Sequence, residues 1–180
     1  AILKNVAMEN LVDLTKKAFE NSINRLKEAG ASVSEIMVES VDEASELTSL
    51  LYSPEAYSTW KHQIEKSPDL MFEKILERFR SGANVLASDF ISAWSRLKDL
   101  RQQYHLAIQK FDAVLIPTAP ILPPKISRLI SDGKFYNSQN LLALRNTRIS
   151  NLMGGCSITL PTDIPSCGIL IMEKPNQEER

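Results

Sequence analysis

The sequence predicts an α/β fold that is helix-rich over its first two thirds and ends in strands. Two observations predict it. Apolar residues at helical spacing, flanked by residues that start and stop helices, fill most of residues 9–110. Short apolar runs then follow at residues 113–117, 157–161 and 168–172. Helices combined with strands in this way are typical of an α/β domain.

The first predicted element is an amphipathic helix over residues 9–29. Gly30 follows it and predicts its C-terminal end. The next segment, residues 31–40, is rich in β-branched residues and predicts a short strand, so helix, glycine and strand form one α/β unit. The apolar residues expected on the buried face of the helix are Leu11, Leu14, Ala18, Ile23 and Leu26.

Three further helices are predicted before residue 111. Ser40 followed by Glu43 matches a capping box, which predicts a helix that starts near Val41. The second helix has Ser67 as its cap and ends at Gly82.

In that second helix, Pro68 occupies the first position, where no backbone N–H is needed. Ser88 and Asp89 predict the start of a long helix that runs to about Lys110.

The last third of the chain changes character. "AVLIP", residues 113–117, is a continuous apolar run too short for a helix, which favours a strand covered on both faces. After a polar loop through Gly133, residues 137–155 predict a helix that stops at its two final glycines. "SITLP" and "GILIM" then predict two strands that form a hairpin or lie side by side.

Composition excludes several classes of protein. The 180 residues suit one domain, and a net charge of −1 gives no electrostatic case for nucleic acid or an anionic membrane surface. No apolar segment approaches the ~20 residues that span a bilayer. Cys156 and Cys167 match no zinc pattern, so we expect reduced thiols in a cytoplasmic protein without a metal or cofactor.

Few side chains in the sequence suggest catalysis. His62 and His105 lie on different predicted helices without ligands at metal spacing, and Glu73 with Glu77 fits a solvated helix face. "GGCS", residues 154–157, invites a nucleophile hypothesis, because glycines allow backbone amides to approach an oxyanion. No base accompanies it, so we favour a helix C-cap that leads into a strand.

Two stretches resemble a known family. "FDAVLIPTAP" (residues 111–120) and "NTRISNLMGGCSITLPTDIPSCGILIM" (residues 146–172) are similar to the C-terminal part of amidase signature enzymes. Their order and spacing match the family. Here, however, "LMGGCS" follows Asn151 where Ala-Gly-Leu-Pro is frequent, and Cys167 occupies a place where valine is common.

The resemblance implies the C-terminal part of an α/β/α amidase-signature fold with a mixed sheet. It also implies hydrolysis of a carboxamide C–N bond through a serine acyl-enzyme, in which a lysine and a second serine relay protons. In the family these three residues precede the region that matches here, and no Gly/Ser-rich run occurs in this chain. The resemblance therefore assigns no catalytic residue within residues 1–180.

The sequence accordingly predicts that residues 1–180 are a partial amidase domain. The first residue is Ala1, and "KPNQEER" at residues 174–180 has the composition of a helix start, so both ends look cut. We expect such a chain to be inactive alone and to act with the remainder of an amidase or amidotransferase A-subunit-like chain, or with a partner subunit, on a small amide. The alternative is a non-catalytic interaction module, or a degenerate subunit, that keeps this half of the fold.

Three small polar residues are the candidates for a substrate pocket. Thr118 follows the strand at residues 113–117, where ligands of open α/β sheets bind, and Pro120, Pro123 and Pro124 stiffen its loop. The alternative is that these prolines end an exposed strand.

The other two candidates, Thr147 and Asn151, lie four residues apart and so share one helical face. In the alternative, Thr147 bonds to the preceding turn and Asn151 helps to cap the helix before Gly154.

Overall fold

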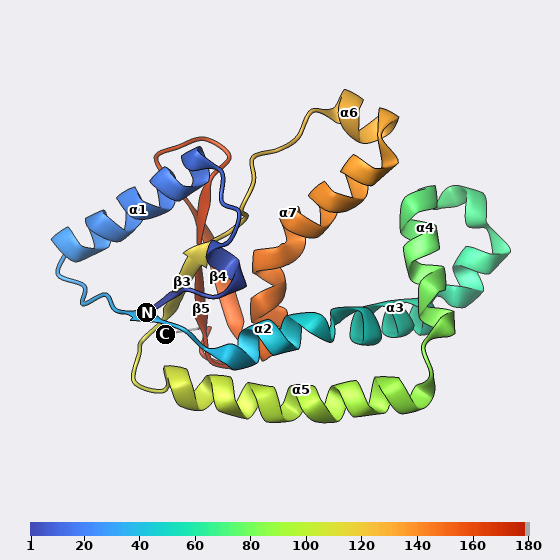
Figure 1. Ribbon diagram of the computed structural model, residues 1–180, viewed down its shortest axis with the longest axis horizontal. Coiled ribbons are helices and arrows are strands. Elements are labelled where there is room, and N and C mark those ends of the chain that lie inside the picture. The colour runs from blue at the N-terminus through green and yellow to red at the C-terminus, as the bar shows by residue number, and fades with distance from the viewer. Residues whose placement is uncertain (179–180) are drawn as a thin grey trace.

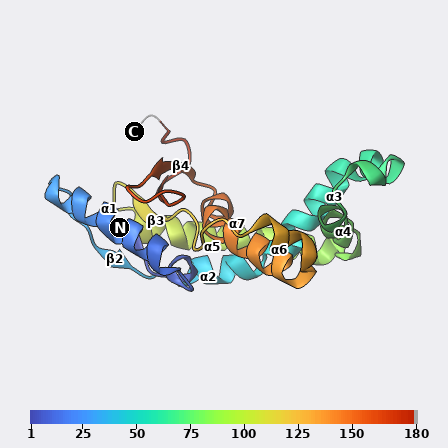
Figure 2. The same ribbon diagram turned by 90° about the horizontal axis from the view of Figure 1, so that it is seen from above.

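A computed structural model of the protein describes residues 1–178. The molecule is elongated, with a sheet at one end and a helical arm at the other, as two perpendicular views show (Figures 1 and 2). The strands are β1 (Ile2–Leu3), β2 (Glu35–Ile36), β3 (Val114–Pro117), β4 (Cys156–Pro161) and β5 (Gly168–Glu173). The α-helices are α1 (Asp13–Glu28), α2 (Glu39–Glu46), α3 (Thr48–Lys66), α4 (Glu73–Arg80), α5 (Ala87–Ile108), α6 (Ile126–Ser131) and α7 (Gly133–Met153). Three 3₁₀ turns are η1 (Val6–Met8), η2 (Pro68–Leu70) and η3 (Ser81–Asn84).

The strands form one mixed sheet in the order β2-β1-β3-β5-β4. Strand β1 pairs in parallel with β2 and β3, whereas β5 runs antiparallel to both β3 and β4. The predicted strands at residues 113–117, 157–161 and 168–172 are all confirmed, and the last two form the expected hairpin. The α/β fold class with a mixed sheet is therefore correct.

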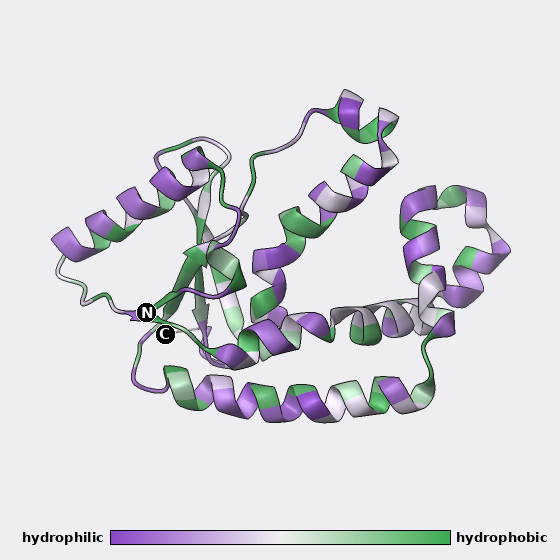
Figure 3. Ribbon diagram, viewed as in Figure 1, coloured by the Kyte–Doolittle hydropathy of each residue, from purple (hydrophilic) through white to green (hydrophobic). Residues whose placement is uncertain are grey.

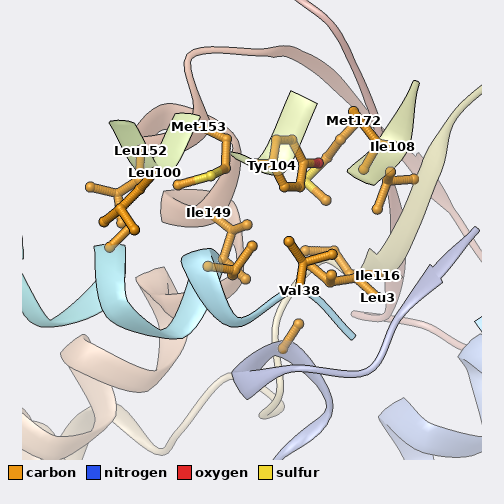
Figure 4. Packing of buried hydrophobic residues seen from close by; sticks show 14 of the residues in the cluster. Leu3, Val38, Leu100, Tyr104, Ile108, Ile116, Ile149, Leu152, Met153 and Met172 are labelled. Carbon is orange, nitrogen blue, oxygen red and sulfur yellow. The ribbon is translucent and has the colours of Figure 1, made fainter. Parts of the chain in front are cut away.

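Helices cover both faces of the sheet. Alternate residues of β3 point to opposite sides, so Val114 and Ile116 join the larger apolar cluster while Leu115 joins a smaller one with Phe19 and Ile23 of α1. The larger cluster fills the space between the sheet and α2, α5 and α7, as the close view shows (Figure 4). Apolar residues (green) accordingly gather on the sheet and on the helix faces turned toward it, whereas purple residues mark the outer faces (Figure 3).

Helix α1 begins at Asp13, four residues later than the sequence predicted. Its C-terminal end is as expected, because Gly30 adopts a left-handed φ of 96°. Leu14 was wrongly placed on the buried face and is 48% exposed, since the face that packs on β3 and β5 is centred about one position further along the helix. The buried residues of α1 are Thr15, Ala18, Phe19 and Ile23.

The expected capping box at Ser40 and Glu43 is absent. Helix α2 begins at Glu39, so Ser40 already lies inside it, buried and without a hydrogen-bond partner for its hydroxyl within residues 1–178. Asn5 instead holds the start of α2: its Oδ1 accepts from the backbone N of Val38 at 2.9 Å, and its Nδ2 donates to the carbonyl of Val38 at 3.1 Å. The sequence missed this contact because it joins the start of α2 to a distant segment.

The helical arm, which consists of α3, η2, α4 and η3, differs most from the prediction. Helix α3 was not predicted, and it contains Pro54 in its interior. Ser67 makes no side-chain cap; Pro68 opens a 3₁₀ turn, and α4 begins only at Glu73. Gly82 lies inside η3 rather than ending a helix, and a Cβ atom there would collide with the backbone of Ser53, so glycine permits η3 to pack closely on α3.

The long helices that lead back to the sheet agree better with the prediction. Helix α5 matches the predicted residues 88–110 within two residues at each end. Helix α7 starts earlier than expected, at Gly133, where Oδ1 of Asp132 accepts a hydrogen bond from the backbone N of Phe135 at 2.9 Å. It ends as predicted at Gly154, which has a φ of 68°.

The C-terminal segment does not contain the expected start of a helix in its described part. Residues 174–178 contain turns at 175–176 and 178 but no helix, and residues 179–180 lie outside the described residues. None of the helices within residues 1–178 combines the length and the apolar character needed to cross a bilayer.

Candidate functional site

Thr118 lies where strands β3, β4 and β5 come together. Its backbone N donates to the carbonyl of Gly168 at 2.9 Å, and its hydroxyl donates to Oγ1 of Thr159 at 3.4 Å. A Cβ atom at Gly168 would lie only 2.8 Å from the Thr118 hydroxyl, so this glycine makes room for it. The hydroxyl is therefore held at one end of the sheet by neighbouring strands.

Asn146 of α7 fixes the end of β3. Its side chain is fully buried, and Nδ2 donates to the carbonyls of Pro117 at 2.7 Å and Ala7 at 3.0 Å. Its Oδ1 accepts from Nε of Arg145 at 3.1 Å, while Nη2 of Arg145 donates to the carbonyl of Glu9 at 2.7 Å. One buried amide thus joins α7, η1 and the strand that precedes Thr118, a role that sequence reasoning missed.

The proline-rich loop after β3 is anchored rather than free. All four residues of β3 are buried, and the carbonyl of Pro120 accepts a hydrogen bond from the backbone N of Val12 at 3.0 Å. The alternative in which the prolines end an exposed strand is therefore wrong for β3 itself. The loop continues over a cavity of about 380 Å³ that Ile121, Leu122 and Pro124 help to line.

A larger cavity, of about 740 Å³, lies between α7 and the helical arm; we name it the α7 cavity. Its other walls come from the helices α2, α3 and α4 and from the 3₁₀ turn η3. This volume falls within the range of small-molecule sites. The residues that α7 contributes are Leu141, Leu144, Thr147, Arg148 and Asn151.

Two guanidinium groups and a phenol face the α7 cavity, from Arg78 of α4, Arg148 of α7 and Tyr52 of α3. Burial lowers the pKa of Arg148, and the positive charge of Arg78 lowers it further, while Tyr52 acts in the opposite direction. Burial raises the pKa of Tyr52, although Arg148 and Arg101 oppose this. Neither Arg78 nor Arg148 forms an ion pair within residues 1–178.

The structure brings two of the three predicted pocket residues into one cavity. Thr147 and Asn151 both line the α7 cavity, whereas Thr118 is not among its lining residues and lies at the end of the sheet. The hydroxyl of Thr147 also donates to the carbonyl of Leu144 at 3.3 Å, which is the bond to the preceding turn that the alternative role of Thr147 predicted. A role in substrate contact stays a prediction for all three.

The end of α7 is capped by backbone and by an arginine, not by the side chain of Asn151. The backbone N of Gly154 donates to the carbonyl of Asn151 at 3.2 Å. Arg101 of α5 donates through Nε to the carbonyl of Leu152 at 2.6 Å and through Nη2 to that of Asn151 at 3.3 Å. The amide of Asn151 is thereby left free to face the cavity.

The segment "GGCS" has the structural role that we favoured. Gly154 is the C-cap of α7, and a Cβ atom at Gly155 would collide with the backbone of Glu173. Cys156 begins β4, and its Sγ donates to the carbonyl of Lys174 at 3.2 Å. Across residues 1–178, no group of three His, Cys, Asp or Glu side chains is placed to hold a metal ion.

Sequence reasoning missed Tyr52, Arg78 and Arg148 as cavity residues. One signal was present, because α7 contains basic residues but no aspartate or glutamate over its 21 residues. A helix without acidic residues cannot pair its own arginines at the usual spacing of three or four. That observation marks Arg148 as a charge that needs a partner from elsewhere.

Comparisons with known proteins agree on one family. The sequence model of a family described as "Amidase" matches residues 1–180. The chain is 26% identical over 178 residues to a 2-amino-5-chloromuconic acid deaminase of Comamonas testosteroni, in a match that covers 91% of the chain and 36% of the relative. It is 25% identical over 180 residues to the A-type subunit of a glutamyl-tRNA(Gln) amidotransferase of Clostridium acetobutylicum, over 87% of the chain and 37% of the relative.

Solved structures share the fold. A 6-aminohexanoate cyclic dimer hydrolase complexed with substrate superposes with a TM-score of 0.80 at 17% identity, over 99% of this chain and 42% of that one. An allophanate hydrolase of Kluyveromyces lactis gives a TM-score of 0.79 at 18% identity, over 96% of this chain and 29% of that one. The chain thus spans little more than a third of the curated relatives it matches, at 36% and 37% of their lengths.

Proposed function

The chain belongs to the Amidase family, and we propose that it forms part of an enzyme that hydrolyses the C–N bond of a carboxamide. The observation that carries the proposal is the family match over residues 1–180, which includes both the strand that leads to Thr118 and the end of α7. Residues 1–180 then form the C-terminal portion of an amidase domain. The shares of 36% and 37% that they cover of their curated relatives support a match to only part of such a domain.

The proposed chemistry is serine acyl transfer. A serine oxygen bonds to the amide carbonyl carbon, the C–N bond breaks, and the nitrogen leaves with a proton as ammonia or an amine. Water then cleaves the acyl ester to release a carboxylic acid and the free serine. The nucleophile and its proton relay belong to the remainder of the domain or to a partner subunit, so residues 1–180 alone are inactive.

Within this enzyme, the described residues form a wall of the substrate site. Thr147 and Asn151 present a hydroxyl and an amide to the α7 cavity, and Thr118 presents a hydroxyl at the end of β3. The hydrogen bonds of Asn146 and Arg101 hold the helix that carries the first two. A wall built on a fixed helix suits the positioning of an amide for attack.

The test is turnover by the complete enzyme across a panel of linear amides, with released ammonia as the readout. We expect hydrolysis, and transfer of the acyl group to added hydroxylamine, since a hydroxamate forms from an acyl-enzyme. Asn151→Ala and Thr118→Val should lower kcat/KM by about 10-fold, through loss of a hydrogen bond to the substrate or its surroundings.

Matched controls separate this role from folding. Thr59→Val on α3 and Asn24→Ala on α1 change exposed residues outside the α7 cavity and should leave turnover unchanged. The melting temperatures of all four variants should stay within ~3 °C of the parent. Absence of turnover with every amide would overturn the amidase proposal, and unchanged kinetics of both site variants would remove Thr118 and Asn151 from the site.

A non-catalytic subunit is the second candidate, favoured by the outer strand of the sheet. Strand β4 pairs on one side with β5 and has no strand on its other side within residues 1–178. Its Ile158 and Leu160 are 57% and 42% exposed, as expected of a surface that another chain covers. Stable association with a second chain, without amide turnover by the complex, would favour this candidate.

A further inference from the structure

A second cavity continues the α7 cavity toward α6. It measures about 360 Å³ and lies between α4 and the first half of α7; we name it the outer cavity. Arg78 and Leu141 line both cavities, so the two spaces meet at these side chains. A molecule that passes through the outer cavity therefore reaches the α7 cavity directly.

Three side chains join α4 to the start of α7 at the outer cavity. Lys74 of α4 and Tyr136 of α7 both line it, and Nζ of Lys74 lies 4.5 Å from the centroid of the Tyr136 ring. Nζ also donates to the carbonyl of Leu129 in α6 at 3.4 Å. Phe72, just before α4, packs edge-on against the same ring, with the centroids 5.5 Å apart. We name Phe72, Lys74 and Tyr136 the latch; it forms where the start of α4 meets the turn between α6 and α7 (Figure 1).

The first half of α7 is not held by the core. Within residues 126–153, the buried side chains all lie between Asn146 and Met153. Helix α6 and the first turns of α7 thus stand clear of the two apolar clusters. Segments with few buried contacts are the ones that move at low cost in free energy, so this end of the helix pair can shift relative to α4.

The latch contacts are of a kind that opens and closes. Phe72 is 57% exposed, and Lys74 and Tyr136 are half-buried. An edge-to-face ring pair and a cation–π contact at such a site each contribute little free energy. Both contacts are made by side chains, so the backbone hydrogen bonds of α4 and α7 stay intact when the latch opens.

We propose that the latch is a gate. When closed, it blocks the outer cavity; when it opens, α6 and the first turns of α7 move away from α4 and admit the substrate to the α7 cavity. The three latch residues then select amides by size, because a bulky molecule needs a wider opening than a small one. The selection of amides rests on the proposed function, whereas the gate itself rests on the contacts between α4, α6 and α7. Gates of this kind control access in enzymes without touching the reacting atoms.

Closure is tested first, without turnover. Asn140→Cys places a thiol on the wall of the outer cavity of the complete protein, and absorbance follows its modification by dithionitrobenzoate, a bulky aromatic disulfide. Adding Tyr136→Ala or Lys74→Ala should speed the modification by about 10-fold, because loss of a latch contact raises the population of the open state. The protein without Asn140→Cys measures the background from Cys156 and Cys167.

Trp60→Ala and Lys134→Ala are the matched controls. Trp60 is 52% exposed on α3, Lys134 is exposed in the first turn of α7, and neither lines the α7 cavity or the outer cavity. Both controls should leave the modification rate within about twofold of the Asn140→Cys protein, and all melting temperatures should agree within ~3 °C. Equal acceleration by the controls, or no acceleration by either latch variant, would overturn the gate.

Kinetics tests selection by size with a matched pair of amides. Butyramide and phenylbutyramide differ in a phenyl ring at the end distant from the amide. The kcat/KM for phenylbutyramide relative to that for butyramide should rise by about 10-fold in Tyr136→Ala and Lys74→Ala. It should stay within about twofold in Trp60→Ala and Lys134→Ala. A merely structural role would lower kcat/KM for both amides equally, so an unchanged ratio in the latch variants would contradict selection by size.

The two measurements separate the two proposals. Faster thiol modification in the latch variants, without hydrolysis of any amide, would support the gate and overturn the amidase function. Hydrolysis of both amides, at a kcat/KM ratio that the latch variants leave unchanged, would support the amidase function and overturn the role of the latch in substrate entry.

Discussion

The two faces of helix α7 differ in what satisfies their polar groups. On the face toward the sheet, Asn146 is fully buried and its amide uses both its donor and its acceptor in hydrogen bonds. On the face toward the α7 cavity, Arg148 forms no ion pair and the side chain of Asn151 no hydrogen bond within residues 1–178. The polar groups of one face are thus satisfied within residues 1–178, whereas those of the other face an open cavity.

This difference predicts which substitutions affect folding and which affect function. A residue whose contacts are all internal contributes to the free energy of unfolding, so its loss destabilises the protein. A residue that faces an open cavity contributes little to stability and is free to serve binding. The helix therefore offers matched pairs of residues, a few positions apart, on which the distinction can be measured.

Substitution of the two asparagines should give the largest contrast. Asn146→Leu removes the amide donor from the carbonyl of Pro117 and leaves the carbonyl of Ala7 with only the 3.4 Å bond from Arg145, so the free energy of unfolding should fall by about 4 kcal/mol. Asn151→Leu, on the exposed cavity face, should change it by less than about 1 kcal/mol. Urea unfolding of both variants checks this, and equal losses would contradict the division of α7 into two faces.

Apolar truncation should give a smaller contrast of the same sign. Ile149 is 1% exposed, so Ile149→Ala should cost about 3 kcal/mol through lost burial and the cavity left behind. Leu144 lines the α7 cavity and is 44% exposed, so Leu144→Ala should cost less than about 1 kcal/mol. Thermal unfolding of the two variants provides the measurement. A larger loss of stability for Leu144→Ala than for Ile149→Ala would contradict the assignment of the core to the face of α7 that carries Ile149.

The smallest expected effect is on the pH dependence of stability, through His105. This residue belongs to α5 and lies beside the backbone of Met153, near the end of α7. Burial lowers the pKa of His105 from 6.5, and Arg101 and Lys174 lower it further, while the Met153 backbone opposes them. The unfolded chain then binds a proton at a higher pH than the folded protein does. The stability from a neutral His105 is therefore present above pH 6.5 and is lost as the pH falls from 6.5 through the lower, folded pKa.

Replacement of this histidine should remove that dependence. His105→Gln should unfold with a flatter pH profile below pH 6.5, measured as urea midpoints against pH. His62→Gln, at an exposed position of α3, serves as the control and should retain the slope of the parent. An unchanged slope in His105→Gln would assign the acid sensitivity to other groups.

Features set by neighbouring residues were predictable from the sequence. The apolar run of β3, the glycines that end α7 and the hairpin of β4 and β5 all depend on local patterns, and the structure has each of them. Helix α3 was missed because its interior Pro54 is ordinarily a helix breaker.

Features set by distant residues were not predictable in the same way. The start of α2 is held by Asn5, which no local capping rule can identify. Thr147 and Asn151 could be placed on one face because both belong to α7. Their neighbours Arg78 and Tyr52 reach the same cavity only because α3 and α4 fold back against α7.

The strand order determines when, during folding, the α7 cavity can form. Strand β3 sits between β1 and β5, so Leu115 pairs with Ile2 on one side and with Ile171 on the other. Such separated pairings close slowly, whereas the α3 and α4 walls are joined by contacts between nearby residues. The arm can therefore assemble early, but Arg148 and Arg78 line one cavity only after the sheet has closed and docked α7. The α7 cavity is thus a late product of folding, because a chain with an unpaired β3 has not yet placed α7 against the arm.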